Sequence, residues 1–261
     1  VLDITYPPVI VTAKVLFKLM RQRVVVSGSE SIPRKGGALL AINHTGYIDF
    51  IYAGAGAEPQ KRLVRFMIKK EMMDKAGVGH LLRSFHHIRV DRASGVQSMK
   101  DALAYLKAGE VVGIYPEATI SRSFEIKELK SGAARIAADA GVPLIPVIVW
   151  GAHRLMTKDH EKDFSRSPKT IVVKVGEPMY PTGEDVAAET AELRVAMQRM
   201  LDEVIADYPE DEKQPGSWWT PARFGGSAPT PEKAEEMDKA ELRERAAKRA
   251  AKKAEQAQKK A

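Results

Sequence analysis

A histidine and an aspartate that could act as a proton-transfer pair lie five positions apart, as His44 and Asp49. A carboxylate that accepts a hydrogen bond from one imidazole nitrogen fixes the tautomer and leaves the other nitrogen free to take a proton. In a continuous helix, residues five apart point about 140° away from each other, so the chain must bend for these two to meet. The apolar run Ala38–Ile42 predicts a strand that ends just before the pair, with a helix after it. The segment therefore predicts a general base, His44, that Asp49 orients.

The hydroxyl that such a base would activate belongs to a substrate, because no serine or cysteine accompanies the pair on its loop. The spacing alone is weak evidence, since His86 and Asp91 repeat it. That second pair lies in a segment typical of a strand, where residues five apart face opposite sides. We therefore interpret the second pair as a coincidence, and the order of strand, turn and helix favours the first.

Further polar side chains follow the ends of later predicted strands. Arg89 and Arg92 flank one strand end, and Glu117 and Thr119 follow another. Each arginine by itself is more typical of a surface salt bridge. However, ligands of open α/β folds bind beyond the carboxyl ends of the strands. The joint placement therefore predicts one cleft that holds a base (His44), a cation and a polar loop.

The elements that must position these residues alternate along the first 210 positions. Short, apolar segments rich in β-branched residues predict strands at Ala38–Ile42, Arg65–Ile68, His87–Val90, Val111–Tyr115, Leu144–Val149 and Ile171–Val175. Helical spacing of apolar residues predicts helices at Tyr47–Ala57, Met72–Ser84, Ser94–Lys107, Gly132–Ala140 and Asp185–Ala206. Thr45 is placed to cap the first of these helices. The alternation predicts an α/β domain with a mixed, largely parallel sheet flanked by helices.

The two ends of the chain differ from this domain. Tyr6–Arg23 combines apolar residues at helical spacing with four basic residues, which suits equally an interfacial membrane helix and a helix packed on the domain. Residues 215–231 contain four prolines and three glycines and predict a linker or a surface strap. Arg245–Ala261 carries seven basic residues and one acidic residue and predicts a solvated helix or a disordered tail. We expect an amphipathic membrane-associating helix (1–23), a catalytic domain (24–214) and a linker with a basic tail (215–261).

The composition excludes several classes of protein. The absence of cysteine excludes a thiol nucleophile, a thiolate metal site and a disulfide framework. His80, His86 and His87 do not present a ligand set, so we expect no metal. No run approaches the roughly 20 apolar residues of a spanning helix. The formal net charge of +7 favours an anionic partner, which could be nucleic acid, an acidic membrane face or a phosphorylated substrate.

Four segments in order resemble the motifs of the glycerolipid acyltransferase family, whose best-known members are the 1-acyl-glycerol-3-phosphate acyltransferases. They span about residues 38–150 and read Asn43-His44-x4-Asp49, Ile88…Arg92, Pro116-Glu117-x-Thr119-x-Ser121 and Val142-Pro-x-x-Pro146-Val. The form Pro-Glu-Ala-Thr-Ile-Ser-Arg is similar to that of bacterial, particularly actinobacterial, members. The resemblance implies transfer of a fatty acyl group from acyl-CoA or acyl carrier protein to lysophosphatidic acid or glycerol 3-phosphate, without a cofactor, in phospholipid biosynthesis.

The resemblance also implies roles for individual residues. His44 would deprotonate the acceptor hydroxyl and Asp49 would orient it. Arg92 would bind the acceptor phosphate, while Glu117 and Thr119 would shape the acceptor pocket. The substrate-binding residues implied in this way are Asn43, Arg89, Arg92, Glu117, Thr119, Arg122 and Lys130.

The third motif departs from the usual Glu-Gly-Thr-Arg of the family. Ala118 replaces the glycine and Ile120 replaces the arginine, so part of the usual phosphate clamp is missing. Either Arg122, Lys130 or Arg89 substitutes for it, or the acceptor is another lysophospholipid or a glycolipid.

The resemblance further implies a peripheral protein on the cytoplasmic face of the cell membrane. Its expected partners are the thioester donor, the glycerolipid acceptor and an anionic membrane surface. A nucleic-acid-binding protein would fit the net charge, but it leaves the four motifs unexplained, and the basic tail lacks interleaved aromatic residues. A non-catalytic membrane-surface protein would be favoured only if His44 or Asp49 were replaced.

Overall fold

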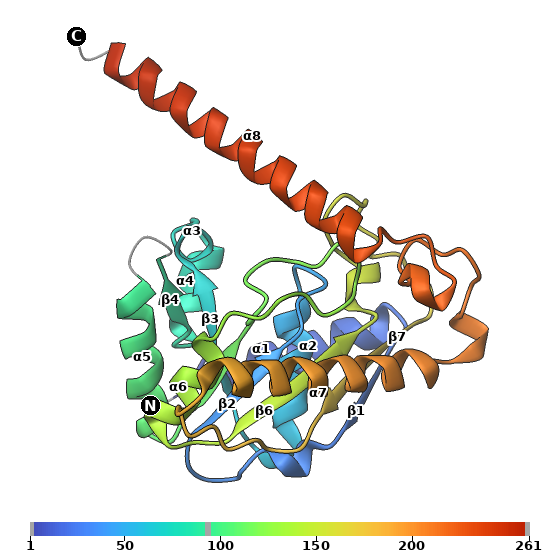
Figure 1. The fold of residues 1–261 in the computed structure, drawn as a ribbon. Helices are drawn as coiled ribbons and strands as arrows, with labels where there is room; N and C mark the ends of the chain where they lie inside the picture. Colours follow the sequence, from blue (N-terminus) through green and yellow to red (C-terminus); the bar gives the residue numbers. More distant parts are fainter. Residues whose placement is uncertain (1–2, 92–94, 259–261) are drawn as a thin grey trace.

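Seven strands form one mixed sheet in the computed structural model, within the residues that it describes, 3–91 and 95–258 (Figure 1). The strand order is β1-β7-β6-β2-β5-β3-β4. All neighbouring strands are parallel except β6 and β7, which are antiparallel. The mixed, largely parallel sheet that the sequence predicts is thereby confirmed. The strands are β1 (Gln22–Ser27), β2 (Ala38–Ile42), β3 (Val64–Lys69), β4 (Ile88–Val90), β5 (Val111–Ile114), β6 (Leu144–Trp150) and β7 (Lys169–Val175).

Helices cover both faces of this sheet. One face packs against α5, α6 and α7, and the other packs against α2, with α1 next to it (Figure 1). Within the described residues the α-helices are α1 (Tyr6–Leu19), α2 (Asp49–Ala57), α3 (Lys70–Met73), α4 (Val78–Ser84), α5 (Gly95–Lys107), α6 (Gly132–Ala140), α7 (Val186–Ala206) and α8 (Pro231–Gln258).

The central strand β2 is buried on both sides, which explains its uninterrupted apolar sequence. Leu39 and Ala41 contribute to the core on one face of the sheet, and Leu40 and Ile42 contribute to the core on the other. β2 pairs in parallel with β5 on one side and with β6 on the other. The loops that follow β2 and β5 therefore begin side by side at the same edge of the sheet.

Two predicted helices differ from the observed ones, and one strand was not predicted. The helix predicted over Tyr6–Arg23 ends at Leu19, and Arg21, with a φ of +57°, turns the chain into β1, a strand that the sequence analysis missed. The predicted boundary after residue 23 thus falls inside β1. The helix predicted over Met72–Ser84 is broken into α3 and α4, because Gly77 takes a φ of +74° directly before α4.

The C-terminal region crosses the domain and then leaves it. The predicted linker or strap lies on the surface of the domain, where Trp219 is buried and its carbonyl oxygen lies 2.9 Å from the Nε2 atom of His153. The predicted basic tail belongs to a single long helix, α8, whose first turns contact the domain and whose remainder extends away from it (Figure 1). Among the described residues, no helix combines the length and the apolar character that crossing a membrane requires.

The tight turn after β6 gives a test of the fold. Gly151 has a φ of +92°, and a Cβ atom there would overlap the carbonyl oxygen of Thr170 in β7. We expect Gly151→Ala to lower the free energy of unfolding by about 3 kcal/mol or more, since both strain and overlap must be relieved. Gly141→Ala is the matched control, because Gly141 takes the left-handed conformation after α6 with a φ of +64° and its Cβ would meet nothing within 4 Å, and it should cost only about 1–2 kcal/mol for the left-handed backbone. Equal losses in urea unfolding would contradict this account of the turn.

Candidate active site

The predicted pair meets where β2 gives way to α2. The chain bends through residues 43–48, the His44 loop, and α2 begins at Asp49. His44 Nδ1 lies 3.1 Å from Asp49 Oδ2, and the same oxygen accepts the N–H groups of Thr45 and Gly46, each at 2.8 Å. With Nδ1–H donating to the carboxylate, Nε2 is the nitrogen that can accept a proton from another molecule.

Hydrogen bonds to the carboxyl of Asp49 partly offset the effect of its burial, which raises its pKa overall. Burial of its side chain raises the pKa of the carboxyl, while hydrogen bonds from His44, Gly46 and Thr45 lower it. Oδ2 accepts all three bonds, and Oδ1 has no hydrogen-bond partner among the described residues. A carboxylate held in this way can stabilise an imidazolium.

The prediction that Thr45 caps the following helix is wrong. The residue before α2 is Ile48, and no side chain caps the helix. The Thr45 hydroxyl is buried without a hydrogen-bond partner among the described residues, whereas its backbone N–H donates to Asp49. Instead, the side chain of Asp49, the first residue of α2, accepts hydrogen bonds from the backbone N–H groups of Thr45 and Gly46 in the loop that precedes the helix.

Tyr115, which the sequence analysis did not single out, stacks on the His44 ring. The centroids of its ring and the His44 ring lie 4.3 Å apart, with 29° between the planes. The only sequence signal was its position at the end of a predicted strand, directly before the third motif. Contact with this ring restricts the rotation of the imidazole.

Glu117 ties the third motif to the His44 loop. Its Oε1 atom accepts the backbone N–H of His44 at 2.8 Å, and its Oε2 atom accepts that of Lys127 at 3.1 Å. The N–H of Ser121 donates to the carbonyl oxygen of His44 at 2.7 Å. Burial raises the pKa of Glu117 to about 8, although the two backbone donors lower it. The structure thus places this carboxylate as a bridge beneath the loop.

Other predicted binding residues are engaged within the protein. Asn43 is buried, and its amide exchanges two hydrogen bonds with the backbone of Val149 in β6, so it holds strand ends together. Thr119 accepts a hydrogen bond from the Nζ atom of Lys127 at 2.8 Å. Among the described residues, no group of three or more His, Cys, Asp or Glu side chains is placed to hold a metal ion.

The cations predicted to contact a phosphate are scattered. Arg89 donates to both carboxylate oxygens of Asp74. Arg122 is buried among carboxylates that come from elsewhere in the chain. Lys130 has an exposed side chain, and its N–H donates to Pro116. Arg92 lies outside the described residues. The structure thus brings together His44, Asp49 and the third motif, while Arg89 and Arg122 are already paired.

Comparison with known proteins adds relatives with this architecture. A family model described as Acyltransferase matches residues 23–150. The 1-acyl-sn-glycerol-3-phosphate acyltransferase of Bacillus subtilis is 32% identical over 195 residues, which cover 72% of this chain and 92% of that protein. The enzyme of the same name from Pseudomonas aeruginosa is 26% identical over 189 residues, 71% of this chain and 70% of that protein.

A solved structure shares the fold. The 1-acyl-sn-glycerophosphate acyltransferase PlsC from Thermotoga maritima superposes with a TM-score of 0.60. The match covers 76% of this chain and 81% of that chain at 24% identity. The sheet and its flanking helices are therefore an architecture common to both proteins.

The buried Glu117 carboxyl gives a test in the pH dependence of stability. Its pKa is about 8 in the folded protein against an ordinary value of 4.5, so the folded state binds more protons between these values. The free energy of unfolding should fall as the pH rises from 5 to 8, by a few kcal/mol from this group. We expect a flatter dependence for Glu117→Gln in urea unfolding. Burial lowers the pKa values of His87 and His153 to about 3, and their contribution is the same in both proteins, so it cancels in the comparison. Parallel profiles of stability against pH for the two proteins would contradict the assignment of the pH dependence to Glu117.

Proposed function

This chain belongs to the glycerolipid acyltransferase family, and from that membership we propose that it transfers a fatty acyl group to the free hydroxyl of lysophosphatidic acid. The observation that carries the proposal is the imidazole of His44, which a buried carboxylate orients and an aromatic ring covers at the carboxyl ends of β2 and β5. The reaction would belong to phospholipid biosynthesis. The curated relatives that bear the name 1-acyl-sn-glycerol-3-phosphate acyltransferase support this acceptor.

The proposed mechanism uses His44 as a base and then as an acid. Nε2 accepts the proton of the acceptor hydroxyl as its oxygen attacks the carbonyl carbon of an acyl thioester. Asp49 stabilises the imidazolium through the hydrogen bond to Nδ1. The tetrahedral intermediate then collapses, the C–S bond breaks, and the leaving thiolate takes the proton back from Nε2. No cofactor takes part, and the donor is acyl-CoA or acyl carrier protein.

The third motif departs from the family pattern, and this departure bears on the identity of the acceptor. Ile120, which replaces the usual arginine, is buried, so this position packs in the domain and offers no cation. We assign the acceptor phosphate to Arg92 on the basis of its place in the second motif. Another lysophospholipid or a glycolipid is the alternative acceptor, and glycerol 3-phosphate is the third. A panel of these acceptors, assayed with one acyl-CoA, separates them.

An apolar groove suits the fatty acyl chain. It lies between α1, α2 and β3 and is partly open to solvent. Phe50 and Ile51, the two residues after the proposed orienting carboxylate Asp49, contribute to its wall together with Phe17 of α1. A chain bound there would run along α2 from the His44 loop.

The helix α1 offers one apolar face to the domain and a second to solvent. Phe17 stacks on Tyr52 of α2 with ring centroids 4.7 Å apart. Val11, Val15 and Leu19, spaced by four, form a stripe whose exposed fractions are 61%, 53% and 56%. An exposed apolar stripe beside basic residues is typical of an interfacial helix. We therefore propose that α1 inserts into the anionic, cytoplasmic face of the cell membrane and that the protein is peripheral there.

The role of His44 predicts a specific loss of activity. His44→Ala should reduce acyl transfer from acyl-CoA to lysophosphatidic acid by about 10²–10⁴-fold, the usual contribution of a general base. Circular dichroism and the unfolding midpoint should show that the fold survives. His86→Ala, the histidine of the second spaced pair, is the control and should retain most activity. Similar losses in the two variants would mean that the base has been assigned to the wrong histidine.

Membrane association predicts a different pattern, read by co-sedimentation with vesicles. The full chain should bind anionic vesicles more than neutral ones, and salt should weaken only the electrostatic part. Val15→Glu combined with Leu19→Glu should weaken binding at least about tenfold, since each buried apolar side chain contributes about 1.5–3 kcal/mol. Val195→Glu on α7, where the side chain is 67% exposed, is the matched control. If the α1 variant still sediments like the unmodified protein, α1 does not insert.

A further inference from the structure

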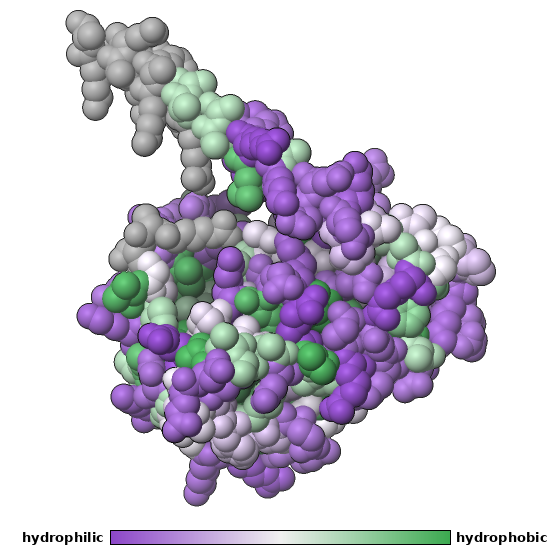
Figure 2. Space-filling model, in the orientation of Figure 1, coloured by the Kyte–Doolittle hydropathy of each residue, from purple (hydrophilic) through white to green (hydrophobic). Residues whose placement is uncertain are grey.

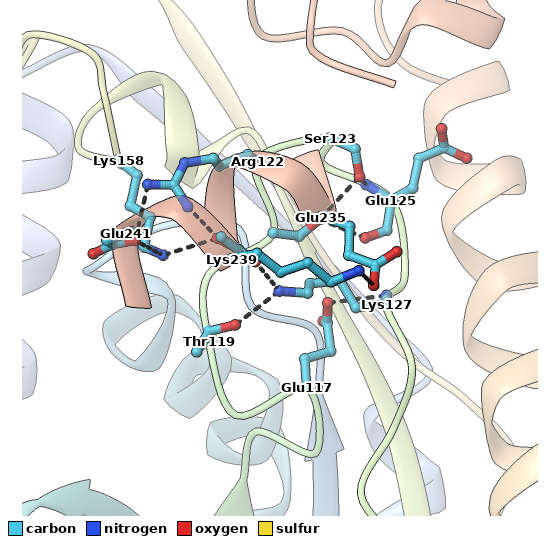
Figure 3. A network of polar contacts seen from close by, with 12 residues as sticks. Glu117, Thr119, Arg122, Ser123, Glu125, Lys127, Lys158, Glu235, Lys239 and Glu241 are labelled. Atoms are coloured by element: carbon cyan, nitrogen blue, oxygen red, sulfur yellow. Dashed lines mark hydrogen bonds and ion pairs between the residues drawn. The ribbon is translucent and has the colours of Figure 1, made fainter. Parts of the chain in front are cut away.

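Three cations come together from two different loops (Figure 3). Arg122 and Lys127 belong to the third-motif loop, residues 116–127, and Lys158 belongs to the loop between β6 and β7. Their side chains are partly or largely buried, with Arg122 the most enclosed. Such a concentration of positive charge needs anionic partners.

Both loops are attached to the loop that carries the proposed base. The third-motif loop donates a hydrogen bond from Ser121 to the carbonyl oxygen of His44 at 2.7 Å. The β6–β7 loop donates one from the Thr157 hydroxyl to the carbonyl oxygen of Thr45 at 2.6 Å. The three cations therefore border the same site.

The partners of these cations come from α8. Asp238 pairs with all three cations, and Glu241 pairs with Arg122 at 2.9 Å and with Lys158 at 3.1 Å. Although burial alone would raise it, hydrogen bonds from the two cations lower the pKa of Glu241 to about 2. Two carboxylates on successive turns of one helix thus fill the space between the two loops.

The geometry of Arg122 shows which of its edges α8 uses. Its Nε–H donates to Asp159, a neighbour on the β6–β7 loop, while its two terminal nitrogens donate to Asp238 and Glu241. The terminal edge of a guanidinium can bind a planar or tetrahedral oxyanion with two parallel hydrogen bonds. Asp159 therefore orients the group, and α8 occupies its binding edge.

Apart from these ion pairs, little holds α8 to the domain. Ala234 is buried and Met237 is half-buried, but the described side chains beyond Glu241 are exposed. Figure 2 shows mostly hydrophilic side chains, with some hydrophobic ones among them, where the helix leaves the domain. A helix without an apolar face gains little from packing, so its contact depends on charges that an anion in solution can replace.

We propose that Arg122, Lys127 and Lys158 form a binding site for a substrate phosphate, which α8 fills with Asp238 and Glu241 until the phosphate displaces it. This inference rests on the proposed function, because the three cations border the proposed active site. A phosphate monoester carries a charge of about −1.5 to −2 and three acceptor oxygens. Its charge matches the two carboxylates, and its oxygens match the three cations. With Ile120 in the place of the usual arginine, these cations supply the missing positive charge.

The phosphate has two possible sources, the headgroup of the acceptor and the nucleotide of CoA. Glycerol 3-phosphate represents the first and adenosine 3′,5′-bisphosphate the second. Calorimetric titration of the full chain with each probe, at fixed ionic strength and without an acyl donor, measures the site directly. A failure of acyl transfer in other assays would leave this measurement unaffected, so the two proposals fail separately.

The decisive variant removes the two α8 charges while keeping the shapes of the side chains. Asp238→Asn combined with Glu241→Gln should bind one of the probes at least about tenfold more tightly than the unmodified protein. In the unmodified protein α8 fills the site, and the apparent affinity for the probe is reduced in proportion to the fraction of molecules in which the site is open. Glu235→Gln combined with Glu236→Gln is the control, since these carboxylates pair with lysines of α8 itself, and it should bind like the unmodified protein. Equal or weaker binding by the first variant, or no binding of either probe to it, would overturn the proposal.

A second measurement uses the unmodified sequence and does not depend on how the variants fold. Lys239 lies between the two carboxylates on α8. The probe that binds should accelerate tryptic cleavage after Lys239, compared with potassium chloride at the same ionic strength. An unchanged cleavage rate at saturating probe would show that α8 is a fixed clamp on the two loops, and it would overturn the displacement.

Discussion

The Oδ2 atom of Asp49 accepts three hydrogen bonds, from His44, Thr45 and Gly46, at a position closed to solvent. A buried carboxylate without such donors would be neutralised or would destabilise the fold by several kcal/mol. The loop supplies the donors only because β2 ends at Ile42 and α2 begins at Asp49 itself. The same atom therefore shapes the bend and orients the imidazole.

The parallel arrangement of the central strands extends this constraint to the rest of the site. β5 lies beside β2, so the third-motif loop begins next to the His44 loop, and Glu117 can bridge the two. β6 lies on the other side of β2, and Asn43 locks the two strand ends through Val149. Asn43 and Glu117, which the sequence predicts as substrate-binding residues, thus hold in place the loops around the proposed base.

The charged side chains next to the proposed base are paired with a distant part of the chain. The cations next to the His44 loop are satisfied by carboxylates of α8, a helix with few packing contacts of its own. At the opposite end of the chain, α1 exposes an apolar stripe while Phe17 anchors it to α2. The domain thus carries a cluster of cations paired with α8 and an exposed apolar stripe on α1.

The sequence by itself determined the elements whose signals are local. The run Ala38–Ile42 is apolar at every position because the strand is buried on both faces, and the spacing of His44 and Asp49 required the bend that the structure contains. Tertiary structure alone decided the partner of Asn43, 106 residues away, and the α8 partners of Arg122, 116 and 119 residues away. β1 escaped prediction because its apolar residues continue those of α1, and only pairing with β7 makes them a strand. The periodicity of apolar residues shows which side of an element is buried. A guanidinium, however, can donate hydrogen bonds to a carboxylate or to a phosphate, so its partner depends on what the fold brings within reach.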